Sequence, residues 1–395
     1  YYENIIVNKT VSIIGENRTS TIIDGNQNEN VIYVKAHNVL ISGFTLQNGT
    51  NGIWLYYSQN CTISGNNVND NAYGIKLYHS SNSTIRENNV TNNEEFGITL
   101  QYSGKCTLKN NTLVDNHYNF GVDGATLYDF INNIDTSNTV NGKPIYYLLN
   151  QTNLTIDSST FPEIGYLAFV NSININVKDL TLARNTQGIL FAYMSNSTIS
   201  NMTTADNWNG IYLKGSSNCQ VTGNNARNNF DYGIALRLCR NCTVNRNHVE
   251  NNNWGGISLG SSWNSVIIEN NVTNSYYGIH LVDSTNCLVT GNNVSKGNGG
   301  YSIVIYRAYD NTVYRNSFIN HFIYAYGMSN NTWDNGLEGN YWSGYSGIDV
   351  NQDGIGDTPY ILDEHNEDNY PLIGAFRNFT ISYEEKTYYI TIVSN

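Results

Sequence analysis

The chain has 395 residues, of which only 13% are charged, and its formal net charge is −12. It has no basic block that could neutralise phosphates, which excludes a nucleic-acid-binding protein. No apolar run approaches the roughly 18 residues of a membrane-spanning helix. Abundant Tyr, Gly and Asn, with only four Pro, favour strands and turns over helices.

The chain begins at Tyr1 without Met and ends at Asn395 after a strand-like alternation. We therefore interpret it as a mature product or a fragment of a longer precursor. It also contains sixteen Asn-x-Ser/Thr sequons, and we expect several of them to carry N-linked glycans on an exported surface protein. The sequon residues are Asn8, Asn17, Asn48, Asn60, Asn82, Asn89, Asn110, Asn150, Asn153, Asn196, Asn201, Asn241, Asn271, Asn293, Asn330 and Asn378.

Short units that each close on a Gly-Ile pair recur along the chain. The glycines of these pairs are 22 or 23 residues apart within two runs, Gly52 to Gly97 and Gly188 to Gly278. Each unit holds three short stretches of alternating character separated by Asn and Gly, which predicts three strands and three turns. The repeat therefore predicts an all-β fold, a right-handed single-stranded parallel β-helix with one unit per coil. Such coils stack about 4.8 Å apart.

Aligning the units places similar residues in columns, meaning the same position in successive coils. One inward column holds Cys or Ser, and the column two residues later holds Ile, Val or Leu. Three residues further on, Asn recurs, and we expect these inward side chains to hydrogen-bond the backbone and one another from coil to coil. The predicted asparagine ladder comprises Asn66, Asn88, Asn111, Asn224, Asn247, Asn270, Asn292 and Asn316.

Two regions depart from the repeat. Residues 115–185 lack a clean Gly-Ile unit, but Gly97 and Gly188 are 91 residues apart, close to four coils, so we expect coils that continue with loops. After about residue 332 the repeats stop. We predict a β-helix over residues 1–332, a C-terminal cap over 333–373, and terminal strands over 374–395 that begin a further domain or serve in assembly.

Several stretches together resemble a known family. They are the Asn-rich Gly-Ile coils, the first coil "YYENIIVNKTVSIIGENRTSTIIDG", "NTVNGKPIYYLLN" at 138–150 and "GNYWSGYSGIDVNQDGIGDTPY" at 339–360. In these features the chain resembles the NosD-like parallel β-helix repeat proteins found on archaeal cell surfaces. The resemblance spans residues 1–373 and implies a right-handed β-helix and export. The family name derives from bacterial members linked to copper maturation of nitrous oxide reductase, whereas most surface relatives have a presumed binding or structural role.

One acidic loop has the spacing of a cation site. Oxygen-bearing side chains alternate from Asp349 through Asn351 and Asp353 to Asp357, with Gly354 at the turn and the carbonyl of Ile355 as a further ligand. This pattern is similar to the start of an EF-hand loop and predicts structural Ca²⁺. The twelfth position is Tyr360 rather than Glu, and an acidic surface turn is the alternative.

Most of the six cysteines fall in the inward Cys/Ser column. Cys219 and Cys242 lie one coil apart, within reach of a disulfide, and free core thiols are the alternative. Cys239 and Cys242 form a single CxxC pair without the second pair that a metal site would need. The His and Met residues are scattered, which argues against copper.

The outward positions bear on catalysis. Sugar chemistry needs carboxylates close together, but no outward column beside the Gly-Ile pairs stacks two, and Asp70, Asp115 and Asp206 are not on neighbouring coils of the repeat. Residues 115–185 remain open as the place of an active site. The outward aromatic residues are interpreted either as a sugar-stacking face or as ordinary strand formers. They are Trp54, Tyr56, Tyr78, Tyr102 and Tyr212.

Together these features predict an exported, non-catalytic, structural or adhesive surface protein of an envelope S-layer, sheath or extracellular assembly. Its expected partners are itself, other envelope proteins and polysaccharide. Self-association through "KTYYITIVSN" as an unpaired strand is part of this hypothesis. The alternatives are a carbohydrate-active enzyme, such as a polysaccharide lyase, hydrolase or epimerase, and a glycan-binding module.

Overall fold

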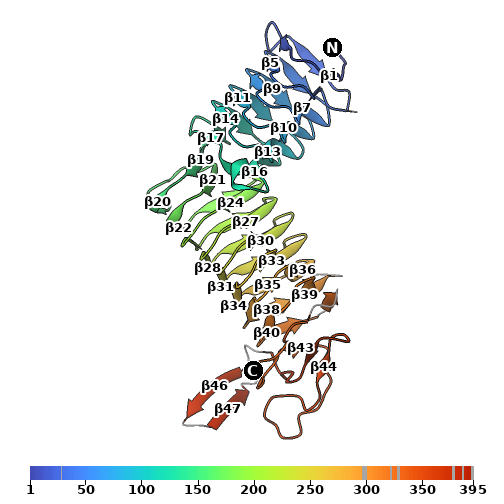
Figure 1. Ribbon diagram of the computed structural model, residues 1–395, viewed down its shortest axis with the longest axis vertical. Helices are drawn as coiled ribbons and strands as arrows, with labels where there is room; N and C mark the ends of the chain where they lie inside the picture. Colours follow the sequence, from blue (N-terminus) through green and yellow to red (C-terminus); the bar gives the residue numbers. More distant parts are fainter. Residues whose placement is uncertain are drawn as a thin grey trace. The chain divides into compact units, whose positions relative to one another are not determined.

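The computed structural model describes residues 1–27, 29–295, 300–320, 323–326, 330–375, 379–384 and 387–392. The chain divides into two compact units. The first comprises Tyr1–Ile173, Leu182–Tyr193 and Asp206–Trp208, and the second comprises Asn174–Thr181, Met194–Ala205 and Asn209–Asn395. In each unit, short strands follow one another in coils of three and pair in parallel with the strands of the next coil (Figure 1).

The first unit has three sheets, one for each strand of a coil. The sheet that carries the Gly-Ile pairs, here called the GI sheet, consists of β1 (Ile5–Val7), β4 (Ile32–Val34), β7 (Asn51–Tyr56), β10 (Tyr73–Tyr78), β13 (Phe96–Gln101) and β16 (Tyr118–Asp123). The second consists of β2 (Ser12–Ile14), β5 (Leu40–Ser42), β8 (Thr62–Ser64), β11 (Thr84–Arg86), β14 (Thr107–Lys109) and β17 (Asn133–Ile134). The third contains β3 (Ile22–Asp24), β6 (Thr45–Gln47), β9 (Asn67–Asn69), β12 (Asn89–Thr91), β15 (Thr112–Val114), β18 (Thr139–Val140), β19 (Lys143–Leu149), β21 (Tyr166–Val170) and β24 (Gln187–Ala192).

The second unit repeats this arrangement. Its GI sheet contains β27 (Asn209–Lys214), β30 (Tyr232–Arg237), β33 (Gly255–Gly260), β36 (Tyr277–Val282), β39 (Tyr301–Tyr306) and β42 (Ile323–Tyr326). The second sheet contains β22 (Ile173–Lys178), β25 (Thr198–Ser200), β28 (Gln220–Thr222), β31 (Thr243–Asn245), β34 (Val266–Ile268), β37 (Leu288–Thr290) and β40 (Thr312–Tyr314). The third contains β26 (Thr203–Ala205), β29 (Asn225–Arg227), β32 (His248–Glu250), β35 (Asn271–Thr273), β38 (Asn293–Ser295), β41 (Ser317–Ile319) and β43 (Tyr341–Trp342).

The pairing register confirms the predicted parallel β-helix. Ile53 pairs with Ile75 and Ile75 with Ile98, so each Gly-Ile pair stacks on the next. These isoleucines are at most 1% exposed and fill the bore. Because the strand period is two, the residue after each isoleucine points outward, so the core register also fixes which residues form the outer face.

The predicted asparagine ladder is confirmed, with every member buried. In the first unit, the backbone N–H and Nδ2 of Asn66 both donate to Oδ1 of Asn88, and Asn88 bonds Asn111 in the same way. A second ladder that the sequence analysis missed stands five residues later, where Asn71 donates to Asn93. The same ladder recurs in the second unit, where the backbone N–H and Nδ2 of Asn229 both donate to Oδ1 of Asn252. The two ladders hold two turns of the coil.

In the irregular segment, coil strands continue: β17 and β18 pair in parallel with β14 and β15, and β21 pairs with β19 and β24. After β16 the chain forms the short helix α1 (Leu127–Phe130), and β18 and β19 then pair as an antiparallel hairpin. Asn141 and Gly142 turn this hairpin with φ of 49° and 81°, the left-handed pair that a two-residue loop requires. β20 (Thr152–Ile156) lies in the first unit, and β23 (Thr181–Ala183) spans the boundary residues.

The predicted cap buries two tryptophans, Trp333 and Trp342, and contains the short pair β44 (Tyr360–Ile361) and β45 (Glu367–Asp368). The expectation that the terminal alternation is an unpaired strand is wrong. β46 (Phe379–Glu384) and β47 (Thr387–Ile392) form an antiparallel hairpin instead. In the described residues, no helix is long and apolar enough to cross a membrane.

Candidate functional site

An aromatic face covers the outer side of the GI sheet in the first unit. The rings of Tyr33 and Trp54 stack with centroids 4.8 Å apart, and those of Tyr56 and Tyr78 stack at 5.6 Å with planes 7° apart. All four side chains are partly exposed. The strand register explains the order, since Tyr33 pairs with Trp54 and Tyr56 with Tyr78 in adjacent strands.

A second stack runs along the turn that follows these strands. Tyr57, His79 and Tyr102 occupy one turn position in successive coils, each with φ near 50°. The ring centroids of Tyr57 and His79 are 4.7 Å apart, and those of His79 and Tyr102 are 4.8 Å apart, with planes within 11°. The left-handed turn directs each ring outward, and the coil spacing sets the stacking distance.

The aromatic face is defined by these seven side chains, and it carries positive charge beside its rings. The Nζ of Lys76 lies 5.6 Å from the ring centroid of Trp54, and that of Lys35 lies 4.6 Å from Tyr33. Burial lowers the pKa of Lys76, an effect partly offset by Glu95. The face therefore combines flat apolar rings with ammonium groups, two features that recognise sugar faces and their substituents.

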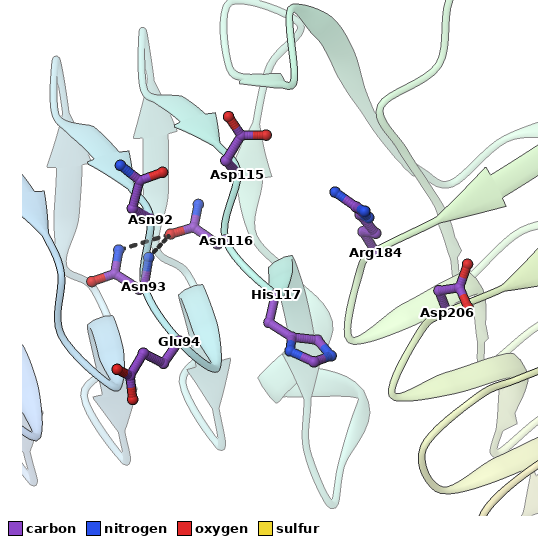
Figure 2. Close-up of a pocket in the computed structure, with 8 residues that line it drawn as sticks. All are labelled: Asn92, Asn93, Glu94, Asp115, Asn116, His117, Arg184 and Asp206. Atoms are coloured by element: carbon purple, nitrogen blue, oxygen red, sulfur yellow. Dashed lines mark hydrogen bonds between the residues drawn. The ribbon is translucent and has the colours of Figure 1, made fainter.

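A polar groove of about 650 Å³ lies in the first unit, and Figure 2 shows the side chains that line it. Its charged side chains come from two columns of turn residues and are exposed. The groove is lined by Asn92, Asn93, Glu94, Asp115, Asn116, His117, Arg184 and Asp206. Behind it, the ring of Phe96 contacts those of Tyr118 and Trp208 at 5.2 and 5.3 Å between centroids, so an aromatic wall stands next to a charged hollow.

The excursion of residues 124–182 builds this groove. When the chain returns, the backbone N–H of Asn119 donates to the carbonyl oxygen of Arg184 at 2.8 Å, and Thr186 donates to Phe120 at 2.9 Å. The returning chain thus brings Arg184 to the groove that Asp115 lines. One coil later, Trp208 donates to Asn185 at 2.9 Å, which brings Asp206 to the same side.

The sequence analysis missed this constellation because Asp115 and Asp206 are 91 residues apart. The sequence did contain one signal for these residues, which is that charged residues replace the usual Asn at one turn position of the coil. At this position Asp115, Arg184 and Asp206 all have φ between 54° and 58°. The groove gathers three carboxylates, one guanidinium and one imidazole. Burial, together with Glu95 and Asp206, raises the pKa of Tyr118 to about 12, so its phenol stays a hydrogen-bond donor at neutral pH.

The other sequence-predicted aromatic residue, Tyr212, is only 9% exposed and belongs to the second unit, so it is not part of the aromatic face. None of the fifteen sequon asparagines in the described residues is buried, and Asn378 lies outside the described residues. Glycosylation at these positions stays a prediction.

The carboxylates of the predicted calcium loop bond to its own backbone. Asp349 Oδ2 accepts from Gly354 at 2.9 Å, Asp353 Oδ1 from Ile355 at 2.9 Å, and Asp357 Oδ2 from Val350 at 2.8 Å. Asn351 Nδ2 donates to Asp353 Oδ2 at 2.9 Å. The predicted ligands are thus gathered in one turn, and calcium binding there stays a prediction.

All six cysteines are buried free thiols. Cys219 and Cys242 share one inward column, as predicted, and their thiols donate to carbonyl oxygens, to Ser217 at 3.4 Å and to Ser216 at 3.7 Å. The thiol of Cys239, which forms the CxxC pair with Cys242, donates to the carbonyl oxygen of Leu213 at 3.7 Å. The disulfide between Cys219 and Cys242 therefore stays a prediction for the oxidised protein.

The family model described as "Periplasmic copper-binding protein (NosD)" matches residues 2–146 and 131–347. The chain belongs to the NosD family. The predicted resemblance to NosD-like β-helix proteins is thereby confirmed, and the description places the family in the periplasm. No curated protein matches the chain significantly.

Solved structures with similar folds have low sequence identity to this NosD-family chain. The A-module of mannuronan C-5 epimerase AlgE4 from Azotobacter vinelandii is 14% identical, with 83% of this chain and 82% of that one covered and a TM-score of 0.29. The periplasmic alginate epimerase AlgG is 12% identical over 75% and 65% of the chains, with a TM-score of 0.32. The Dettilon tailspike protein is 12% identical over 83% and 60%, with a TM-score of 0.31. Nothing about activity follows at these values.

The described residues do not fit the copper of the family description. The three neighbouring thiols sit inside the bore, where each donates to a backbone carbonyl. Across the described part of the chain, no group of three or more His, Cys, Asp or Glu side chains is arranged to hold a metal ion. No chemical step through copper is therefore derived.

Proposed function

We propose that this protein is an exported glycan-binding β-helix that holds an extended polysaccharide along the aromatic face and the polar groove of the first unit. The observation that carries the proposal is the stacked run Tyr57, His79 and Tyr102, beside Trp54, at the spacing of the coils. Such a row presents ring edges and polar ring atoms at the coil spacing, and the partly exposed rings of Trp54 and Tyr78 add aromatic surface on which the C–H groups of pyranose rings can pack.

The negative charge of the protein favours a polysaccharide over a single-stranded nucleic acid, the other polymer that stacks on rows of aromatic rings. Single-stranded nucleic acids also use aromatic platforms, but they need a positively charged groove. The net charge of −12 and the three carboxylates of the groove oppose a phosphate backbone. The hydroxyl groups of a polysaccharide suit a hollow lined by carboxylates, amides and a guanidinium. Glycan binding also fits the adhesive surface role that the sequence predicts.

The test is binding of purified protein to a panel of neutral and acidic polysaccharides by affinity electrophoresis. Trp54→Ala and Tyr78→Ala remove single platforms and should weaken binding about tenfold, since each ring contact is worth on the order of 1 kcal/mol. Tyr309→Ala is the matched control, an exposed tyrosine of the second unit. Binding that is equal in all variants, or absent for every polysaccharide, would contradict the proposal.

The composition of the groove favours a second candidate, cleavage or epimerisation of the bound glycan. Asp115, His117 and Arg184 supply a carboxylate, an imidazole and a guanidinium in one hollow, the group types that general acid–base chemistry on sugars uses. New reducing ends, unsaturated uronate absorbance or altered uronate stereochemistry on incubation with a bound polysaccharide would support catalysis. His117→Ala should then lower the rate while leaving binding to the aromatic face intact.

A further inference from the structure

The second unit has a recess in the outer face of its GI sheet, at strand β33. The outward residues of this strand are small, Gly255, Ser258 and Gly260. Gly255 lies between Tyr232 and Tyr277 of the neighbouring coils, and Gly260 lies between Arg237 and Val282. A Cβ on Gly255 would lie 2.5 Å from the ring of Tyr232, and one on Gly260 would lie 2.7 Å from the guanidinium of Arg237. The two side chains therefore lie flat across β33, in space that any larger residue would occupy.

These two side chains fix a histidine on the far side of the recess. The Oη of Tyr232 is 2.8 Å from Nδ1 of His280, two coils away. Arg237 lies over the ring of Tyr232, with 5.1 Å from its guanidinium carbon to the ring centroid, and donates to Ser258 Oγ at 2.7 Å. Tyr232 is 4% exposed and Ser258 is fully buried, so this network is held inside the packed surface.

The network keeps the imidazole neutral and oriented. Burial, and then the charge of Arg237, lower the pKa of His280 to about 4, so the ring is uncharged at neutral pH. When the Tyr232 hydroxyl donates its hydrogen bond to Nδ1, the neutral imidazole carries its own proton on Nε2. That second nitrogen remains as a single, oriented hydrogen-bond donor.

His280 also forms one wall of a cavity of about 320 Å³. The remaining walls are aromatic, apart from one valine: the cavity is lined by Tyr276, Tyr277, His280, Tyr301, Val304 and Tyr306. The rings of Tyr277 and Tyr301 have centroids 6.0 Å apart and planes 29° apart, and the ring of Tyr277 lies 4.8 Å from that of His280. A volume near the lower end of small-molecule sites suits one ring-sized ligand.

The lining decides between ligand classes. Aromatic cages also bind quaternary ammonium groups, but no carboxylate is among the described residues that line this cavity, and the charge of Arg237 beside His280 repels a cation. The guanidinium is itself engaged with Ser258 and is not part of the lining, so no side chain in the described lining carries a positive charge to pair with an anion. An uncharged ring with an apolar face and hydroxyl groups matches the tyrosine rings and the imidazole donor.

We propose that this cavity binds one uncharged pyranose unit, packed against Tyr277 and Tyr301 and hydrogen-bonded through a hydroxyl to Nε2 of His280. This site lies in a different unit from the aromatic face and uses different residues. It extends the proposed glycan binding, on which it rests for the ligand class, to a second and chemically selective point of attachment.

The test uses the full chain with methyl glycosides of glucose, galactose, mannose and N-acetylglucosamine, followed by saturation-transfer NMR and calorimetry. At least one glycoside should bind to the wild type and to Trp54→Ala alike. Tyr301→Ala and His280→Ala should weaken that binding at least tenfold. Tyr232→Phe should weaken it less, because His280 then loses the partner that orients its ring but keeps its place in the cavity wall.

Val304 pairs with His280 on the neighbouring strand and lines the cavity, but its side chain takes no part in the hydrogen bonds of the network. Val304→Phe therefore fills the cavity, and it keeps the test decisive if Tyr301→Ala does not fold. Thermal unfolding of each variant shows whether it is folded. Binding of no methyl glycoside, or binding unchanged by Val304→Phe and His280→Ala, would overturn the inference. If polysaccharide binding is then still lost in Trp54→Ala, the proposed function stands without the second site. If the wild type binds neither methyl glycosides nor polysaccharides, both the second site and the proposed function are contradicted.

Discussion

Asp368 Oδ2 accepts a hydrogen bond of 2.7 Å from the backbone N–H of Asn340, and the asparagine ladder of the second unit ends on this carboxylate. The ladder runs from Asn224 through Asn316 to Asn340, with each oxygen accepting from the previous residue. Asp368 also accepts from Trp342 Nε1 at 2.8 Å and is fully buried. The cap thus closes the β-helix by supplying the acceptor that the next coil would have provided.

We expect this carboxylate to make stability depend on pH. Burial, only partly offset by the N–H donors, raises the pKa of Asp368 from 3.8 to about 6. The folded state therefore holds the proton more tightly than the unfolded chain, so the free energy of unfolding falls as the pH rises from about 4 to 6. A shift of this size corresponds to about 3 kcal/mol at most.

Urea unfolding of the wild type and of Asp368→Asn at pH 4 and pH 7 measures this effect. The difference in unfolding free energy between the two proteins should change by up to about 3 kcal/mol between these pH values. Asp310→Asn, which removes an exposed carboxylate, is the matched control. Equal pH dependence in all three proteins would show that Asp368 does not titrate as expected.

Removing one member of the ladder should destabilise the second unit. Oδ1 of Asn247 accepts from the backbone N–H and Nδ2 of Asn224, and its Nδ2 donates to the carbonyl of Val221 and to Asn270, all at 2.9 Å. Asn247→Ala leaves several of these buried groups unpaired, at a cost of about 3 kcal/mol. Urea unfolding should show this loss.

Asn245→Ala is the control, because this outward residue lies on the same coil and its Oδ1 has no hydrogen-bond partner in the structure. Its effect should stay within about 0.5 kcal/mol. Equal losses in the two variants would mean that the ladder contributes no more than ordinary surface contacts.

The sequence predicts the fold because the signals are local and repeated. The Gly-Ile pairs, the inward Cys/Ser column and the ladder from Asn66 onward each follow from a fixed period, and the structure contains all three. The second ladder at Asn71 obeys the same period and was within reach of the sequence. The stacking of Tyr57 on His79 could not be predicted from the sequence, because it depends on left-handed turns that the repeat pattern does not reveal.

The candidate groove could not be predicted because it depends on where a long excursion returns. Asp115 and Arg184 become neighbours through the bond from Asn119 to Arg184, a pairing across 65 residues without a repeat to fix its register. The Tyr232–His280 contact was hidden for another reason: it spans two coils and exists only because Gly255 leaves the space between them open.

Calcium should stabilise the cap if the sequence prediction for the Asp349–Asp357 loop is right. Binding to the folded state alone raises stability by mass action, by about 2.7 kcal/mol at a concentration 100 times the Kd. Asp353→Asn keeps the acceptor for Ile355 but removes one charge, so it should reduce the calcium-induced rise in the midpoint of thermal unfolding. Asp310→Asn should keep the full rise. Identical midpoints with calcium and with a chelator would show that the loop is closed by its own hydrogen bonds.

The thiols should be unreactive in the native protein. All six cysteines are at most 2% exposed, and burial raises the pKa of Cys106 to about 12 and that of Cys287 to about 11. Because a reagent must reach the sulfur to attack it and all six sulfurs are packed in the bore, a thiol reagent at pH 8 should label none of them before unfolding. Labelling in denaturant then counts the free thiols by mass. Six labels would show free core thiols throughout, whereas four labels, with Cys219 and Cys242 unlabelled, would establish the predicted disulfide. Fast native labelling would contradict the packing of the bore, since a reagent reaches these sulfurs only when the coils separate.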